Sequence, residues 1–122
     1  MRLVVGGGRA RSFPKLKPDD ISLNIDADAL PDVQGDINRA PFRSGAFHAV
    51  YFEKVPYDAF TGDNIGAIKE MARILQSGGR LAIESGSLVP KALLVAALKE
   101  AGCQYVRITE KGYVRITGRL RK

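Results

Sequence analysis

Apolar and polar residues follow a strand-like pattern in three short stretches of the N-terminal third of the chain. Leu3 to Val5 form an apolar run that stops at three consecutive glycines. Residues 21–25 alternate apolar and polar and end before Asp26, and residues 32–37 form a shorter candidate strand. A period of two is typical of strands with one buried face. We therefore expect three strands here.

Two later segments change to the helical period. From Asp63 onward, apolar residues recur three or four positions apart, which predicts a helix that ends at Ser77-Gly78-Gly79. Its apolar positions are Ile65, Ile68, Ala72 and Leu75. Pro90, a residue tolerated in the first turn of a helix, opens a second helix that runs to Ala101-Gly102.

Strands alternate with these helices and then close the chain. Further strands are predicted over residues 47–52, 80–84, 104–109 and 113–117, and a turn at Lys111-Gly112 makes the last two antiparallel. This order predicts an α/β fold, a doubly wound, mostly parallel sheet with a C-terminal antiparallel hairpin. A length of 122 residues fits a single domain, residues 1–122. In such sheets ligands bind beyond the carboxyl ends of the strands. The loops expected there are residues 6–9, 26–28, 36–42, 53–57 and 84–87.

Charge is unevenly distributed over the chain, which carries +6 overall. Residues 1–18 hold five basic side chains and no acid, residues 19–36 hold six aspartates and no base, and residues 107–122 are again basic. Basic clusters favour phosphate-rich partners, RNA or DNA, although a solvated surface is the simpler explanation.

Composition excludes several classes of protein. No apolar run approaches the ~20 residues that span a bilayer, and the N-terminus lacks a signal-peptide core, so we expect no membrane partner and a cytoplasmic location. The single cysteine, Cys103, rules out an internal disulfide. We expect Cys103 to be an ordinary buried strand residue.

A series of motifs follows in a recognisable order through the middle of the chain. They are Asp36, Ala40-Pro41-Phe42, Ala46-Phe47-His48-Ala49-Val50, and the run from Glu70 to Gly79. This series resembles the class I S-adenosylmethionine (SAM)-dependent methyltransferases, in which an acid precedes an "LPF" segment, an "sFDxV" strand and an "E..RvLkPGG" helix end. The resemblance implies a compact, Rossmann-like methyltransferase fold with SAM as cofactor and no metal.

The resemblance also implies a cofactor site. The loop Gly6, Gly7 and Gly8 would approach the methionine part of SAM, where a side chain would block close contact with the backbone. Asp26 would accept hydrogen bonds from the ribose hydroxyls. Asp36 would lie near the adenine amino group, with Ile37 against the ring. Carboxylates suit these donors because each oxygen can accept two hydrogen bonds.

The first functional hypothesis is methyl transfer from SAM to RNA, with tRNA a candidate. Glu53 and Tyr57, after the fourth strand, would face the substrate. The enzyme needs little acid–base chemistry, because SAM carries an activated methyl group and the protein mainly positions it.

A second hypothesis keeps the fold and changes the reaction. Compact basic domains of this kind also resemble the C-terminal effector domains of bacterial polymorphic and contact-dependent inhibition toxins. Such domains often cleave tRNA without SAM, are neutralised by an immunity protein, and reach the target-cell cytoplasm as part of a larger secreted protein. His48 and Glu53 would then be the candidates for general base or acid, and Arg9, Arg39 and Arg43 could hold phosphate.

A third hypothesis is a non-catalytic RNA-binding module. No predicted helix follows the glycine run, and His48 stands where the methyltransferase motif has aspartate. A lone histidine within a strand is more often a packing or edge residue than a catalytic one. The oligomeric state stays open.

Overall fold

Seven strands form one sheet in the order β3-β2-β1-β4-β5-β7-β6. The computed structural model describes residues 1–6, 16–55, 66–86 and 89–122, with only the backbone of residues 54 and 55. The strands are β1 (Arg2–Val5), β2 (Ile21–Asn24), β3 (Val33–Gln34), β4 (Phe47–Val55), β5 (Leu75–Ser85), β6 (Cys103–Glu110) and β7 (Val114–Leu120). The order runs outward in both directions from the central β1–β4 pair, which confirms the predicted doubly wound fold.

Strand direction also agrees with the prediction. All pairs among β1 to β5 are parallel, whereas β7 lies antiparallel between β5 and β6. The β6–β7 hairpin turns at Gly112, whose φ of +76° suits glycine. Cys103, in β6, is buried as expected, and burial raises the pKa of its thiol to about 11.

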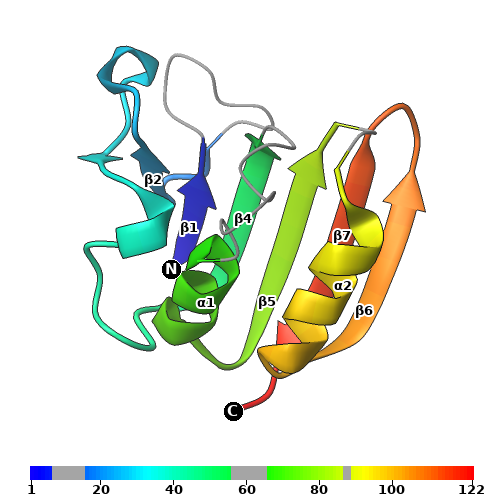
Figure 1. Ribbon diagram of the computed structural model, residues 1–122. Coiled ribbons are helices and arrows are strands. Elements are labelled where there is room, and N and C mark those ends of the chain that lie inside the picture. Colours follow the sequence, from blue (N-terminus) through cyan, green and yellow to red (C-terminus); the bar gives the residue numbers. More distant parts are fainter. Residues whose placement is uncertain (7–15, 56–65, 87–88) are drawn as a thin grey trace.

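The two α-helices, α1 (Gly66–Ile74) and α2 (Lys91–Glu100), cover the same face of the sheet (Figure 1). Successive strand residues point to opposite faces, so every second residue of β4, β5 and β7 enters the core beneath these helices. These buried side chains include Val50, Phe52, Leu81, Ile83, Val114 and Ile116. No α-helix of the described residues covers the opposite face.

The described connections on the N-terminal side of the sheet contain no α-helix. In residues 16–46 the only helical elements are two 3-10 turns, η1 (Ala27–Ala29) and η2 (Ile37–Arg39). Asp26 and Asp36 cap them by accepting hydrogen bonds from backbone N–H groups two residues later. The two carboxylates are therefore fixed just beyond β2 and β3.

Several boundaries differ from the sequence prediction: β4 and β7 each run three residues farther, and β3 is only Val33–Gln34. Helix α1 ends at Ile74, and Leu75 opens β5 by pairing with Phe47, with Ser77-Gly78-Gly79 inside that strand. Leu75 is fully buried, and a buried leucine fits both the helical and the strand period. The hydrophobic pattern therefore did not show where the helix gives way to the strand. Ile25 is 69% exposed, because β2 already ends at Asn24. The predicted helix start at Asp63 lies outside the described residues.

Candidate functional site

The buried side-chain amide of Asn24 links the carboxyl ends of β1 and β2. Gly6, at φ +84°, donates its N–H to the carbonyl of Leu23 at 2.8 Å. The Asn24 side chain donates to the carbonyl of Gly6 at 2.9 Å and accepts from the N–H of Asp26 at 3.0 Å. Asn24 thus positions both predicted cofactor residues, Gly6 and Asp26. The sequence analysis missed it, although a polar residue at the end of a buried strand was the available signal.

Both predicted cofactor carboxylates lie at this edge of the sheet. Asp26 accepts from the N–H of Asp28 at 2.9 Å. Asp36 is exposed, and its Oδ1 accepts from the backbone and side-chain nitrogens of Asn38, each at 2.9 Å. Ile37 is half-buried and packs against the core. The structure therefore brings Gly6, Asp26 and Asp36 to the carboxyl ends of three neighbouring strands. The predicted site residues Gly7, Gly8, Arg9 and Tyr57 lie outside the described residues.

Two residues of the α1 motif hold the loop that carries Asp36. The Glu70 carboxylate accepts from the N–H of Ala40 at 2.9 Å, and Arg73 donates to the carbonyl of Ala40 at 3.0 Å. Glu70 and Arg73 also pair with each other at 2.9 Å. The hydrogen bond from Arg73 lowers the pKa of Glu70 below its usual value, and the hydrogen bond from the Ala40 N–H makes a smaller contribution in the same direction. This Glu70–Arg73 clamp gives the "E..R" motif a structural role.

A second cluster of ionisable groups lies near the carboxyl ends of β4 and β5. Glu53 and Glu84 are only 5% and 6% exposed, and Arg115 donates to Glu84 at 3.1 Å. The Tyr51 ring lies beneath two guanidinium groups, 5.7 Å from Arg2 and 5.9 Å from Arg115. Burial raises the pKa of Tyr51, and the nearby Glu84 carboxylate raises it further, so this phenol stays protonated.

His48 and Glu53 are not brought together. His48 is the exposed second residue of β4, and its Nδ1 contacts the N-terminal amine of Met1. Glu53 lies five residues farther along the same strand, roughly 16 Å away at the rise of a β-strand. The two side chains therefore cannot act as the acid and base of one phosphate cleavage.

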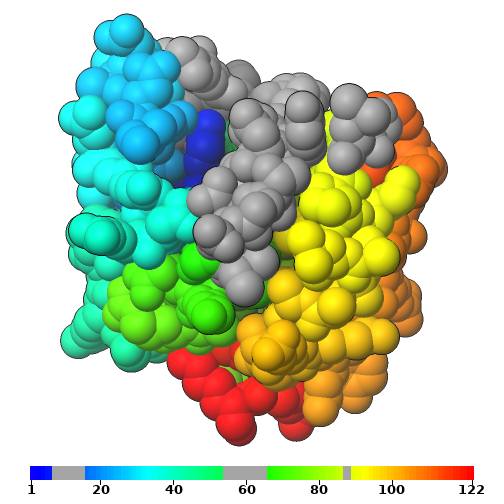
Figure 2. All heavy atoms as spheres, viewed as in Figure 1, coloured from blue at the N-terminus to red at the C-terminus, as the bar shows by residue number. Residues whose placement is uncertain are grey.

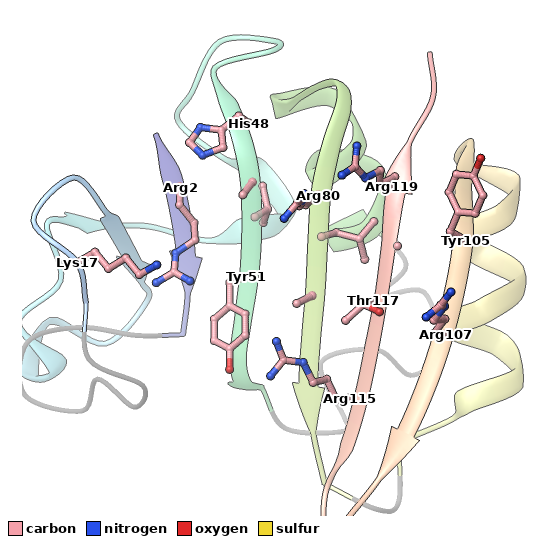
Figure 3. Close-up of a pocket in the computed structure, with 15 residues that line it drawn as sticks. Arg2, Lys17, His48, Tyr51, Arg80, Tyr105, Arg107, Arg115, Thr117 and Arg119 are labelled. Atoms are coloured by element: carbon pink, nitrogen blue, oxygen red, sulfur yellow. The ribbon is translucent and has the colours of Figure 1, made fainter.

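A hollow of about 760 Å³ lies over the face of the sheet that carries no described helix (Figure 3). Six cationic side chains line it: Arg2, Lys17, Arg80, Arg107, Arg115 and Arg119. The predicted phosphate ligands Arg39 and Arg43 are exposed on the segment between β3 and β4 and do not line it. None of these six cations was singled out in the sequence analysis as a site residue, because their common face depends on strand register.

Two further features were searched for in the described part of the chain. No group of three or more His, Cys, Asp or Glu side chains there could hold a metal ion. No helix within those residues is both long and apolar enough to cross a membrane.

Residues 8–83 match the family of proteins described as the methyltransferase domain, and this match covers more than half of the sequence. The chain belongs to this family. The methyltransferase-domain match includes β2 to β4, α1 and most of β5, and hence Asp26, Asp36 and the Glu70–Arg73 clamp. Membership supports SAM as the cofactor. No curated protein matches the sequence.

Solved structures agree with this assignment at the level of the fold. The CurJ carbon methyltransferase is 15% identical with a TM-score of 0.79, and the match covers 99% of this chain and 48% of CurJ. A SAM-dependent methyltransferase from Thermotoga maritima is 17% identical with a TM-score of 0.76, over 98% of this chain and 82% of that one. Geranyl diphosphate methyltransferase is 14% identical with a TM-score of 0.70, and the match covers 97% of this chain and 71% of that enzyme. This methyltransferase domain thus spans about half the length of the first of these proteins.

Proposed function

We propose that this methyltransferase domain transfers a methyl group from SAM to RNA. The observation that carries the cofactor part is the meeting of Gly6, Asp26 and Asp36 at the carboxyl ends of β1, β2 and β3. The RNA part rests on the net charge of +6 and on the cationic side chains gathered on one face of the sheet.

The residues present fit SAM. Both hydrogen bonds that Asp36 accepts from the described residues go to its Oδ1, and Oδ2 would accept from an amino group. Asp26 lies at the end of β2, where its carboxylate suits ribose hydroxyls, and Gly6 exposes backbone without a side chain. Bound SAM would supply an activated methyl group. The buried Glu53, at the edge where substrate would enter, would accept the proton that the methylated atom of the RNA loses.

The cofactor assignment is tested with Asp26→Asn and Asp36→Asn. Asparagine caps a helix about as well as aspartate, so the fold should be retained. Loss of a charged acceptor should weaken SAM binding roughly ten- to a hundredfold, measured by calorimetry. Asp19→Asn, which changes an exposed carboxylate away from the site, is the matched control. Unchanged affinity in both site variants would remove these residues from the cofactor site.

The activity is tested with total tRNA, with and without methyl-labelled SAM. Intact tRNA that gains label would support the proposal, and this label should fall in Glu53→Gln. RNA shortened on a denaturing gel without SAM would instead support the ribonuclease alternative and its immunity protein. Bound but unlabelled and intact tRNA would support the non-catalytic module.

A further inference from the structure

The helix-free face of the sheet holds three arginines that form no ion pair with any carboxylate the structure describes. Of the six that line the hollow, Arg2 pairs with Asp20 at 2.6 Å and Arg115 pairs with Glu84 at 3.1 Å. The charge of Lys17 also acts on the Asp20 carboxylate and helps to lower its pKa. By contrast, no carboxylate of the described residues forms an ion pair with the exposed Arg80, Arg107 or Arg119.

Strand register places these three arginines together. Arg80 in β5 lies directly opposite Arg119 in β7, and Arg107 in β6 lies opposite Thr117, two residues from Arg119 (Figure 3). Directly opposed residues on antiparallel strands have Cβ atoms about 5 Å apart, and like charges there are destabilising. An anion bound between Arg80 and Arg119 would relieve this repulsion.

A strained residue lies beside the cations. Tyr105 in β6 has φ +57°, outside the usual range for a tyrosine, at the point where the β6–β7 register shifts. This residue is 67% exposed and lines the same hollow. Exposed aromatic rings on a sheet are used to stack the bases of single-stranded nucleic acid.

We propose that this face binds a single strand of RNA, with Arg80, Arg107 and Arg119 on its phosphates and Tyr105 against a base. The inference rests on the proposed function, because it takes RNA as the substrate. The surface is separate from the cofactor edge. From Arg80 to Glu84, β5 covers roughly 13 Å, which would lead a bound strand toward Tyr51 and Glu53. The view of the opposite side in Figure 2 shows α1 and α2 instead, where Lys69 and Lys99 are exposed.

The test measures binding of a fluorescein-labelled 12-nucleotide oligouridylate by anisotropy at several salt concentrations. Each phosphate contact of a single strand contributes about 0.7 to the slope of log K against log salt. Arg80→Gln with Arg119→Gln should lower that slope by about 1.4. The matched double variant Lys69→Gln with Lys99→Gln removes two positive charges from the helix side and should leave the slope nearly unchanged.

The aromatic contact has a different signature. Tyr105→Leu should weaken binding roughly tenfold, because a stacked base is lost, while the salt slope stays the same.

Melting temperatures show whether each variant folds. Arg119→Gln should melt at or above the wild-type temperature, because it removes the like-charged pair. A clearly lower value would contradict the opposed-arginine argument.

Three results of the binding assay would overturn the inference. They are equal slope losses in the two double variants, no binding of oligouridylate by the wild type, and tighter binding of an oligoglutamate of equal charge, which would indicate an acidic protein partner. Methyl transfer is scored separately. RNA binding that depends on Arg80 and Arg119 without methyl transfer would support this surface and refute the proposed function. Full methyl transfer by the Arg80→Gln, Arg119→Gln variant would support the proposed function and refute this surface.

Discussion

The Glu70–Arg73 clamp predicts a measurable share of the stability. Glu70→Ala removes the acceptor of the Ala40 N–H and of two N–H groups of Arg73. A hydrogen bond to a charged group is worth about 1.5–3 kcal/mol when buried, and an exposed ion pair less than about 1 kcal/mol. The Glu70 and Arg73 side chains are 21% and 36% exposed, so solvent weakens their pairing. The Ala40 N–H, in a residue only 7% exposed, would lose its partner.

Together these effects give a loss of about 2 kcal/mol. For a chain of 122 residues, 1 kcal/mol corresponds to about 4 °C, so the melting temperature should fall by about 8 °C. Circular dichroism during heating measures this, with the exposed neighbour Lys69→Ala as control. Glu70→Ala and Arg73→Ala should also be strongly non-additive in a double-mutant cycle. A fall of less than about 2 °C in Glu70→Ala would refute the clamp.

Three other predictions concern positions away from the clamp. Burial raises the pKa of Asp20, but the hydrogen bonds from Arg2 and from the Lys17 N–H outweigh it and lower the pKa below its usual value. Ionised Asp20 therefore stabilises the fold above the unfolded carboxyl pKa of about 3.9, and this stabilisation is lost as the pH falls through the folded pKa. In Asp20→Asn, the free energy of unfolding measured with urea should fall less steeply at acid pH. Gly102→Ala should cost at least about 1 kcal/mol, because Gly102 has φ +100° and an added Cβ would lie 2.8 Å from the carbonyl oxygen of Arg121; unchanged unfolding by urea would contradict this. Since the pKa of Cys103 is about 11, iodoacetamide at pH 8 should alkylate it only after unfolding, and rapid labelling of the native protein would show that the thiol is accessible.

A strand or helix was predictable where its buried residues recur with one clear period, two residues for a strand or about 3.6 for a helix. β4 and the hairpin were found because each has one face against α1 or α2. Leu75 was misplaced because a fully buried leucine satisfies both periods, and only its pairing with Phe47 makes it a strand residue. The strand pattern also indicated Asp26 after the second strand and the motif order indicated Asp36, and both lie at one edge because the carboxyl ends of parallel strands share it.

The cationic face was not predictable from the same patterns. Arg80 and Arg119 face each other only because β5 and β7 pair in one particular register. A shift of one residue would have moved one arginine to the other face. In the same way, Glu70 and Arg73 are unremarkable as a helical pair, and their hold on Ala40, some thirty residues earlier, depends on how α1 packs against the loop.

The position of β7 affects the order in which the sheet can be completed during synthesis. β7 leaves the ribosome after the other six strands of this sheet, yet it lies between β5 and β6. Until β7 is available, β5 keeps an unpaired edge and β6 has no strand to join, even though the parallel part from β1 to β5 is already made. An open edge of this kind pairs readily with other chains. We therefore expect a nascent or prematurely terminated chain that lacks β7 to aggregate more readily than a chain that contains it.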